Sequence, residues 1–213
     1  MVDEGSIFAG SIAKSRDFLK CTTTWEYILE ANHSRMLFRL LSEKESDDLL
    51  SVILGLNFTP SGSSPAIRTT RLNDSYLSRV LWDRISQFLP REYSSAQNPS
   101  QVMHLVGFSN SWVCTEVSPA APSNQRLTDS AQVFSPTRSS LFSFVLYLGA
   151  SDDLDGGIRM FFDSPDPSSV AVGSVWPSSG TGLIYPHEFF FTDDGLLSGR
   201  FYRLSTEIVY EIK

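Results

Sequence analysis

Cysteine is scarce in this sequence. Its 213 residues contain two cysteines, Cys21 and Cys114. Two cysteines cannot build the disulfide framework of a small secreted protein, so we expect both to stay reduced inside a cell. The first residues, MVDEGSIFAGSIAKS, start with acidic side chains and lack the apolar stretch of a secretory signal. Both observations favour a cytoplasmic protein.

Positive charge and long apolar runs are also in short supply. The chain has 17 Lys and Arg against 24 Asp and Glu, a net charge of −7. Such a surface does not attract nucleic acid or an anionic membrane. The longest apolar run, LFSFVLYL at residues 141–148, is eight residues long. A membrane-spanning helix needs about 20 residues. We therefore expect neither a nucleic-acid partner nor a membrane partner.

The remaining composition, with 41% hydrophobic and 19% charged residues, is that of a globular protein. The length suits a single domain over residues 1–213. We predict that residues 1–95 form a helical support region. Ser42 and Glu45 have the spacing of a capping box, in which the side chain of each residue accepts a hydrogen bond from the backbone N–H of the other. A second helix is predicted over NDSYLSRVLWDRISQFLP, ending at Pro90, with a mobile loop at residues 57–71 before it.

Beyond residue 100 the apolar period changes from helical to strand-like. Short segments rich in β-branched and aromatic residues are separated by Gly, Pro, Asp and Ser, from QVMHLVGF through LFSFVLYLG to FYRLSTEIVYEI. This pattern predicts an α+β protein: a double-stranded β-helix, or jelly roll, over residues 101–213, with the helical layer packed on one sheet. Residues 118–140 lack apolar periodicity, and we expect a long loop there.

Two segments carry a resemblance to a known family. SFVLYLGASDDLDGGIRMFF has a strand ending in Tyr147 and Leu148, an acidic turn, Gly156 and Gly157, and a short strand. GLIYPHE and the segment from Gly199 to Tyr210 complete the pattern. From about residue 35 onward the chain resembles the prolyl 4-hydroxylase-like branch of the iron(II) and 2-oxoglutarate dioxygenases. The resemblance implies a double-stranded β-helix, and it covers about 80% of the sequence.

The resemblance also implies where metal and co-substrate residues should stand, and there this sequence departs. Enzymes of that family bind iron through His-x-Asp on one strand and a second histidine near the end. The best match puts Cys114 and Glu116 at the first motif and Phe191 at the second histidine. The basic residue that pairs with 2-oxoglutarate falls on Phe201. A phenyl ring gives no lone pair to iron, and an unpaired carboxylate in a dry barrel costs several kcal/mol. We therefore expect no metal and no cofactor.

The candidate site residues follow from this comparison and from the chemistry of the side chains. His187 precedes Phe191 by four residues and is expected to share its face of an extended strand, which makes it the first acid–base candidate. A buried Glu116 would have a raised pKa and could act with it. Two tyrosines on predicted barrel strands could donate hydrogen bonds, so the catalytic set is His187, Glu116, Tyr147 and Tyr185. The expected pocket is lined by Cys114, Trp112, Arg159, Phe189, Phe191 and Phe201.

Three functions remain open at this point. The first is a metal-independent, non-redox enzyme of the isomerase, cyclase or lyase type that acts on a small apolar organic molecule in the barrel. The second is an iron(II) and 2-oxoglutarate-dependent hydroxylase with an unusual ligand set, for which Cys114, Glu116 and His187 are conceivable metal ligands. The third is a non-catalytic relative that binds a ligand or a partner protein. Fold alone does not separate them.

Overall fold

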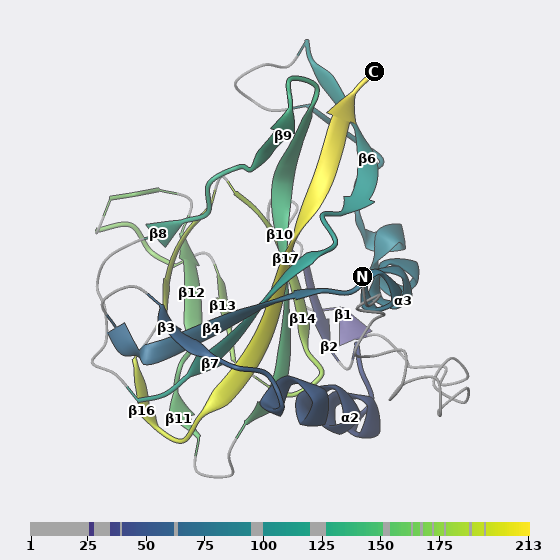
Figure 1. Cartoon of the computed structure of the whole chain (residues 1–213). Helices are drawn as coiled ribbons and strands as arrows, with labels where there is room; N and C mark the ends of the chain where they lie inside the picture. The colour runs from purple at the N-terminus through teal and green to yellow at the C-terminus, as the bar shows by residue number, and fades with distance from the viewer. Residues whose placement is uncertain are drawn as a thin grey trace.

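The computed structural model describes residues 26–27, 35–38, 40–61, 64–94, 100–119, 127–150, 154–162, 164–166, 168–171, 173–176, 178–187, 189–193 and 195–213. Cys21 lies outside these residues. Most of the described chain is antiparallel β-sheet, and Figure 1 shows its strands curling around a common axis. None of the helices described is long and apolar enough to cross a membrane.

A large sheet and a small sheet face each other. The large sheet has the order β1-β2-β14-β10-β17-β7-β4-β3, with β5, β6 and β9 attached at its sides. Its strands are β1 (Glu26–Tyr27), β2 (Arg35–Phe38), β3 (Thr59–Ser61), β4 (Ser64–Asn73), β5 (Glu92–Ser94), β6 (Val102–Phe108), β7 (Ser111–Val117), β9 (Val133–Ser135), β10 (Arg138–Ala150), β14 (Gly182–Pro186) and β17 (Phe201–Ile212).

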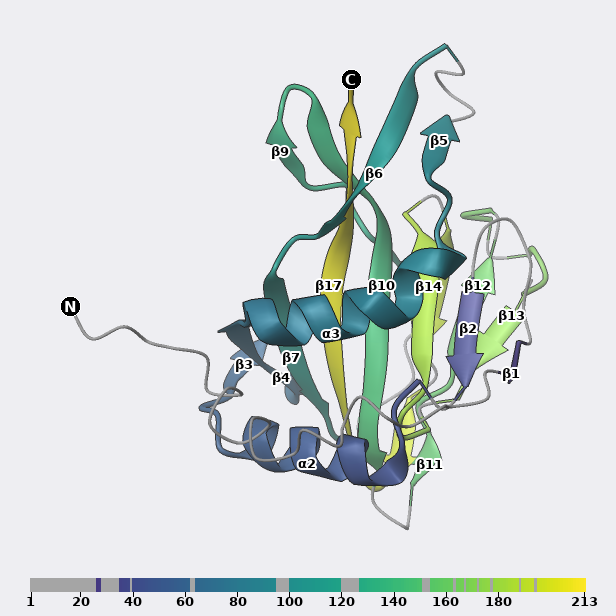
Figure 2. The same cartoon turned by 90° about the vertical axis from the view of Figure 1, so that its right-hand side faces the viewer.

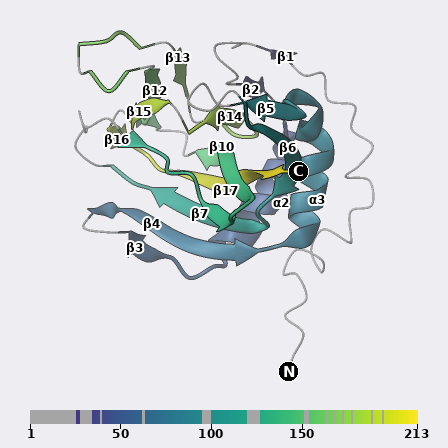
Figure 3. The same ribbon diagram turned by 90° about the horizontal axis from the view of Figure 1, so that it is seen from above.

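The small sheet has the order β13-β12-β15-β8. It is made of β8 (Leu127–Thr128), β12 (Arg159–Phe162), β13 (Gly173–Val175) and β15 (Phe190–Asp193). A separate pair, β11 (Asp155–Gly156) and β16 (Leu196–Ser198), lies near one end. In Figure 3 the small sheet lies on one side of the large sheet and the helices lie on the other. This arrangement is the predicted double-stranded β-helix with a helical layer.

The helices are α2 (Glu43–Leu54) and α3 (Ser75–Ile85), which continues as a short 3-10 turn, η2 (Ser86–Phe88). Figure 2 shows α3 crossing the large sheet over β7, β17 and β10, with α2 below it. The predicted capping box is present, because Ser42 Oγ accepts from the Glu45 N–H and Glu45 Oε2 accepts from the Ser42 N–H. Asp74 caps α3 by accepting from the Leu77 N–H at 2.8 Å.

The central strand β10 has two buried faces, and they belong to different cores. On β10, Phe142 and Phe144 pack toward the helices, whereas Val145 and Tyr147 pack toward the small sheet. We call these the helix face and the barrel face. The helix-face core is joined to α3 by a hydrogen bond of 2.9 Å from Trp112 Nε1 to Ser78 Oγ. The barrel-face core contains Val145, Tyr147, Phe161, Val175, Leu183, Tyr185, Phe189, Phe191, Leu196 and Phe201.

Two expected loops contain strands instead. Residues 57–71 form most of the β3–β4 hairpin, and β4 pairs with β7 from Ile67↔Val117 to Asn73↔Ser111. The pairing buries Leu72 on the helix face, although the segment is rich in Ser, Thr and Pro. The expected loop at residues 118–140 contains β8, β9 and the start of β10. The N-terminal region is therefore a mixture of helices and strands, not helical throughout.

A buried ion pair fastens α2 to α3. Arg84 donates to Glu45 Oε1 at 2.7 Å and to the Leu40 carbonyl at 2.9 Å, and the Glu45 side chain is 6% exposed. Burial acts to raise the pKa of Glu45, but the hydrogen bonds from Arg84 and Ser42 outweigh it and lower the pKa. The charged form of Glu45 is therefore the one that the fold stabilises.

We predict that Glu45→Gln lowers the free energy of unfolding at pH 7 by about 3 kcal/mol, because Arg84 keeps its buried charge and loses its counterion. The lowered pKa means that this stabilisation is fully present above the unfolded pKa of about 4.5 and is lost as the pH falls further. The difference between variant and wild type in urea denaturation should therefore shrink in acid. Asp48→Asn, on the exposed side of α2, is the matched control and should leave stability unchanged. A difference that persists in acid would contradict the argument.

Candidate functional site

Three of the expected site residues, one catalytic and two from the pocket, lie on the helix face of the large sheet and not on the barrel face. Trp112 and Cys114 are fully buried in the helix-face core. Glu116 shares their face of β7 and forms ion pairs with Arg68 at 2.9 Å and with Arg200 at 2.7 Å. The expectation that these residues line the barrel was wrong, because the strand presents its alternate residues to the barrel. Burial also raises the pKa of the Cys114 thiol to about 12, so this group is neither a nucleophile nor a ready metal ligand.

Phe191 lies between two strands, β12 and β8, and β12 contains no His, Cys, Asp or Glu. Leu127 is the direct partner of Phe191 in the antiparallel ladder between β8 and β15, and Asp129 follows two residues later. A metal shared with position 191 would need its first motif on this strand. The His-x-Asp motif implied by the resemblance therefore corresponds to Leu127-x-Asp129, and not to Cys114-x-Glu116. Of the three implied ligand positions, Leu127, Asp129 and Phe191, only Asp129 has a metal-binding atom.

The site does not fit iron. Leu127 and Phe191 carry no lone pair for a metal, and one carboxylate alone does not make a three-residue facial ligand set. Within the described part of the chain, no group of three or more His, Cys, Asp or Glu is placed to hold a metal ion. The side chains of Leu127 and Phe191 are therefore the reason for the poor fit to iron.

Arg159 occupies the space next to Phe191. Its guanidinium carbon lies 4.2 Å from the centre of the Phe191 ring, in a cation–π contact. It donates to Asp193 through Nε at 2.6 Å and through Nη2 at 2.8 Å, and Nη1 donates to the Tyr185 hydroxyl at 3.2 Å. Arg159 is 3% exposed. A permanent positive charge is thus held against the ring that stands in the place of the second histidine.

Asp193 is the counterion of this buried guanidinium. Arg203 also reaches it, with Nη1 at 3.5 Å from Oδ2. Burial acts to raise the pKa of Asp193, but the positive charges of Arg159 and Arg203 are stronger and hold it well below its usual range. Asp193 is thus a partly exposed carboxylate that neutralises a buried arginine.

A chain of hydrogen bonds continues from Arg159 across the barrel face. The Tyr185 hydroxyl donates to Asp129 Oδ2 at 2.6 Å, and Ser143 Oγ donates to the same oxygen at 2.8 Å. Ser143 Oγ also lies 3.1 Å from His187 Nε2. Because the single hydroxyl proton of Ser143 goes to Asp129, this contact requires the proton on His187 Nε2. The oxygen Asp129 Oδ1 accepts no hydrogen bond from the described residues.

His187 ends this chain next to Glu207. Its Nε2 lies 3.0 Å from Glu207 Oε2, but the angle does not meet hydrogen-bond geometry, and its Nδ1 is buried without a partner among the residues described. His187 sits in the turn after β14, so HEFFF is not one extended strand. Phe189 and Phe191 nevertheless face the barrel, as expected. His187 lies against β10 and β17, where Ser143 pairs with Glu207.

The two predicted tyrosines are both buried, and Tyr185 donates a hydrogen bond to Asp129. Burial raises the pKa of Tyr185, and the charge of Arg159 only partly opposes it. Burial likewise raises the pKa of Tyr147, against the charges of Arg159 and Arg203. Both hydroxyls therefore keep their protons at neutral pH. Tyr147 packs against Phe201, with 6.0 Å between ring centres.

Phe201 fits into the barrel because the neighbouring Gly156-Gly157 motif has no side chains. Gly157 has φ +75°, and a side chain there would bring a Cβ within 2.9 Å of the Phe201 ring. The Gly-Gly motif thus both turns the chain and leaves room for the aromatic residue at the position where the resemblance implies a base. The barrel face is closed here by apolar side chains.

The structure therefore brings seven expected residues together around the barrel and excludes three. His187, Tyr147, Tyr185, Arg159, Phe189, Phe191 and Phe201 contribute to it; Trp112, Cys114 and Glu116 do not. Sequence reasoning missed Asp129, Ser143, Asp193, Arg203 and Glu207. Ser143 could have been predicted from the sequence, because it lies on the same strand face as Tyr147 in LFSFVLYL. Asp129 was not, because β8 is only two residues long.

Solved structures with a similar fold include two prolyl hydroxylases and OsALKBH1. OsALKBH1 superposes with a TM-score of 0.61 at 14% identity, covering 86% of this chain and 100% of that one. The viral collagen prolyl hydroxylase of Paramecium Bursaria Chlorella virus-1, solved with 2OG, gives 0.58 at 14% identity, over 86% and 98% of the two chains. A Pseudomonas putida prolyl-4-hydroxylase gives 0.56 at 16% identity, over 83% and 92%.

The fold is that of the 2OG-Fe(II) oxygenases. This confirms the predicted jelly roll and the resemblance to the prolyl hydroxylase type at the level of the fold. No family model matches the sequence, and no curated protein does. At identities this low, similarity of fold carries no information about catalysis, and function has to be argued from the site.

We predict that Arg159→Leu lowers the free energy of unfolding by about 2 kcal/mol at pH 7. This loss is smaller than that for breaking a fully buried ion pair, because Asp193 keeps its contact with solvent and its ion pair with Arg203. The Asp193 side chain is 39% exposed. The folded pKa of Asp193 is lowered, so the stabilisation in the wild type exists above the unfolded pKa of about 3.8 and is lost in stronger acid. The gap between variant and wild type in denaturant melts should be largest near neutrality.

The double variant Arg159→Leu/Asp193→Leu should recover much of the lost stability, because it removes both charges together. Arg203→Leu is the matched single variant, and its effect should be smaller than that of Arg159→Leu. A double variant as unstable as Arg159→Leu would show that Asp193 is not the reason for the loss.

Proposed function

We propose that this protein is a metal-independent enzyme that performs acid–base chemistry on a small organic molecule at the barrel. The supporting observation is the hydrogen-bonded set around Asp129: Tyr185 and Ser143 both donate to Oδ2, and Oδ1 has no partner in the described part of the chain. A carboxylate fixed through one oxygen presents the other to a substrate proton. Proton abstraction by a positioned base accelerates reactions by about 10²–10⁴-fold.

The neighbouring residues suit this role. Two hydrogen bonds fix the orientation of the Asp129 carboxylate. Tyr185 keeps its proton because burial raises its pKa, and Arg159 in turn donates to its oxygen. Ser143 links Asp129 to His187 on the other side. A proton taken by Asp129 from one carbon of a substrate can be returned to another, which is the chemistry of an isomerase, or followed by loss of a leaving group, as in a lyase.

The barrel-face aromatic rings favour an apolar substrate. Phe161, Phe189 and Phe191 pack around Tyr185, with ring centres of Phe161 and Tyr185 5.2 Å apart. An apolar surround lowers the local dielectric constant and strengthens each electrostatic interaction with the reacting atoms. The substrate class in this proposal is therefore a small, largely apolar molecule with an acidic C–H bond. We place the chemistry in the barrel and without iron or 2-oxoglutarate.

We predict that the protein purified without chelator contains no stoichiometric iron, and that 2-oxoglutarate with manganese(II) binds more weakly than about 1 mM, equivalent to about −4 kcal/mol. One reason is that Leu127 and Phe191, at the implied ligand positions, are apolar. The other is that Asp193 already pairs with Arg159 and Arg203, so these arginines are not free for 2-oxoglutarate. Elemental analysis and calorimetric titration measure the two quantities. Micromolar binding would favour an oxygenase with displaced ligands.

We further predict that the protein catalyses exchange of a substrate C–H with solvent. Incubation with a metabolite extract in heavy water, in the presence of EDTA, should introduce deuterium into one or a few metabolites, detected by untargeted mass spectrometry. Asp129→Asn should abolish this incorporation, since the amide cannot accept the proton. His187→Ala should reduce it while the fold remains intact.

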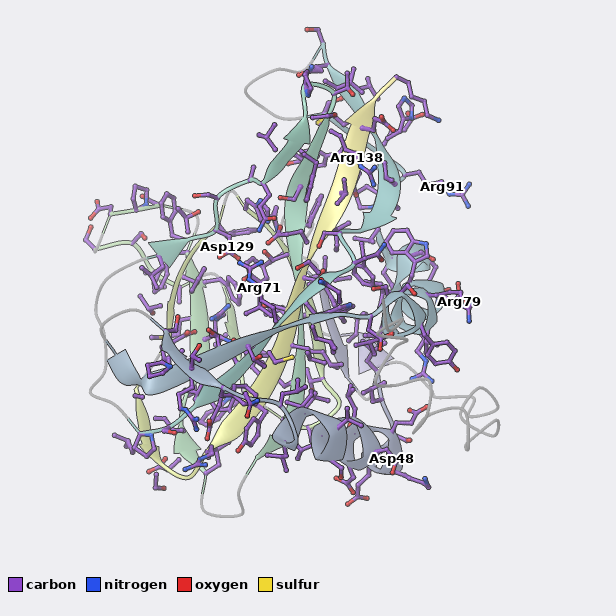
Figure 4. The ribbon with its side chains drawn as sticks, viewed as in Figure 1. Asp48, Arg71, Arg79, Arg91, Asp129 and Arg138 are labelled. Atoms are coloured by element: carbon purple, nitrogen blue, oxygen red, sulfur yellow. The ribbon has the colours of Figure 1, made fainter. Side chains whose placement is uncertain are left out.

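Asp48→Asn, far from the barrel in Figure 4, is the control and should behave as the wild type. Addition of oxygen to a metabolite that depends on iron and 2-oxoglutarate would instead identify a hydroxylase. An extract that the protein leaves chemically unchanged would favour a non-catalytic binding protein.

A further inference from the structure

Arg71 is a charge on the barrel face that the internal network does not use. Arg159 and Arg203 both form ion pairs with Asp193. Asp129 accepts hydrogen bonds from Tyr185 and Ser143, and Glu207 lies against His187. Arg71, in contrast, forms no hydrogen bond or ion pair with any described residue, and its side chain is exposed.

The strand register fixes the face on which Arg71 lies. It pairs with Val113 of β7, Val113 pairs with Ser205 of β17, and Ser205 pairs with Val145 of β10. Val145 belongs to the barrel-face core. Direct partners in an antiparallel ladder point to the same face, so Arg71 stands on the barrel face of β4. Its neighbour Leu72 points the other way, into the helix-face core.

Asp129 lies across from Arg71, after β8 of the small sheet. Figure 4 draws both side chains between the ribbons of β4 and β8, whereas Arg79 and Arg91 project from the opposite side of the molecule. No ion pair joins Arg71 to Asp129 in the described structure, and the Asp129 carboxylate already accepts two hydrogen bonds. The guanidinium is therefore free to take an anion that approaches the same side of the barrel as the candidate base.

We propose that Arg71 recognises the carboxylate of a small apolar monocarboxylic acid, whose apolar part lies toward the barrel-face aromatic rings. This inference rests on the proposed function, because it assigns the ligand class of that same site. A guanidinium fork binds a carboxylate through two parallel hydrogen bonds, which gives orientation as well as attraction. Orientation by Arg71 would hold the acid's carbon skeleton near Asp129 Oδ1.

One carboxylate fits this site better than two. The guanidinium of Arg159 already donates two hydrogen bonds to Asp193, and Arg203 reaches the same carboxylate. Phe201, 4% exposed, closes the floor of the barrel near Tyr147. A second carboxylate of a ligand beside Arg159 and Arg203 would have to give up its hydration, although Asp193 already pairs with both of these cations, which is unfavourable.

The test compares phenylacetate with phenylacetamide, which has the same shape and no charge. In a chemical-shift titration of isotope-labelled protein, phenylacetate should bind in about the millimolar range, as suits a ligand of its size. It should shift signals of Val113 and Thr115 on the barrel face of β7. Phenylacetamide should bind about tenfold more weakly, the loss expected for one charge-assisted contact. Succinate, the dicarboxylate, should bind no better than phenylacetamide.

Arg71→Gln should remove the preference for phenylacetate over phenylacetamide, and Arg91→Gln should keep it. Equal binding of the two probes to the wild type, no binding of either, or an unchanged preference in Arg71→Gln would overturn the proposal. Deuterium incorporation dependent on Asp129 can still be found in each of those cases, so the two proposals fail separately. Preference for phenylacetate without any such incorporation would contradict the proposed enzyme and leave Arg71 as the anchor of a binding protein.

Discussion

The buried guanidinium of Arg159 is the charge around which the barrel is organised. An arginine that is 3% exposed has to be neutralised and hydrogen-bonded, and the antiparallel register of β12 with β15 places Asp193 directly opposite it. The same register places Phe161 opposite Phe191. Phe191 then provides a ring face for the cation, and Tyr185 accepts its remaining hydrogen bond. A change at Arg159 therefore removes contacts of Asp193, Phe191 and Tyr185 together.

The large sheet separates this polar interior from the part of the core that supports the fold. Its helix face is covered by α2 and α3 and is held by Trp112, Ser78 and the ion pair of Glu45 with Arg84. Its barrel face carries the hydrogen-bonded groups. Because neighbouring residues of a strand belong to opposite faces, Cys114 and Glu116 are structural while Val113 and Thr115 look into the barrel. A slip of one residue in the alignment exchanges the two roles.

Sequence reasoning was sufficient for the architecture and insufficient for the site, for a physical reason. The jelly roll follows from local alternation and the helix start from the Ser42 capping box, both of which are encoded within a few residues. The hairpin of β3 and β4 was missed because its barrel face carries Thr69 and Arg71, so the strand lacks an apolar pattern. Asp129 was missed because its position depends on pairing with β15, more than 60 residues away in sequence.

Buried strands explain the error at residues 114 and 116. Alternation says which residues share a face, but a sheet covered on both sides has apolar residues on both, so the pattern does not say which face looks into the barrel. Only the packing of Trp112 against the helices decides it.

The two apolar residues at the implied ligand positions, Leu127 and Phe191, are consistent with the charges around them. On the proposed function, the barrel has exchanged a dissociable cation and a dissociable anion for Arg159 and Asp193, which are tethered to adjacent strands. A tethered pair has no association entropy to overcome, and it is present in every molecule as soon as the chain folds. It also repels a divalent cation from the neighbourhood of Phe191, since the guanidinium lies 4.2 Å from that ring. Restoring histidines at 127 and 191 without removing Arg159 would therefore place the new ligands beside a competing positive charge. On the proposed function, the charge of Arg159 therefore adds to the effect of the missing histidines in opposing iron binding.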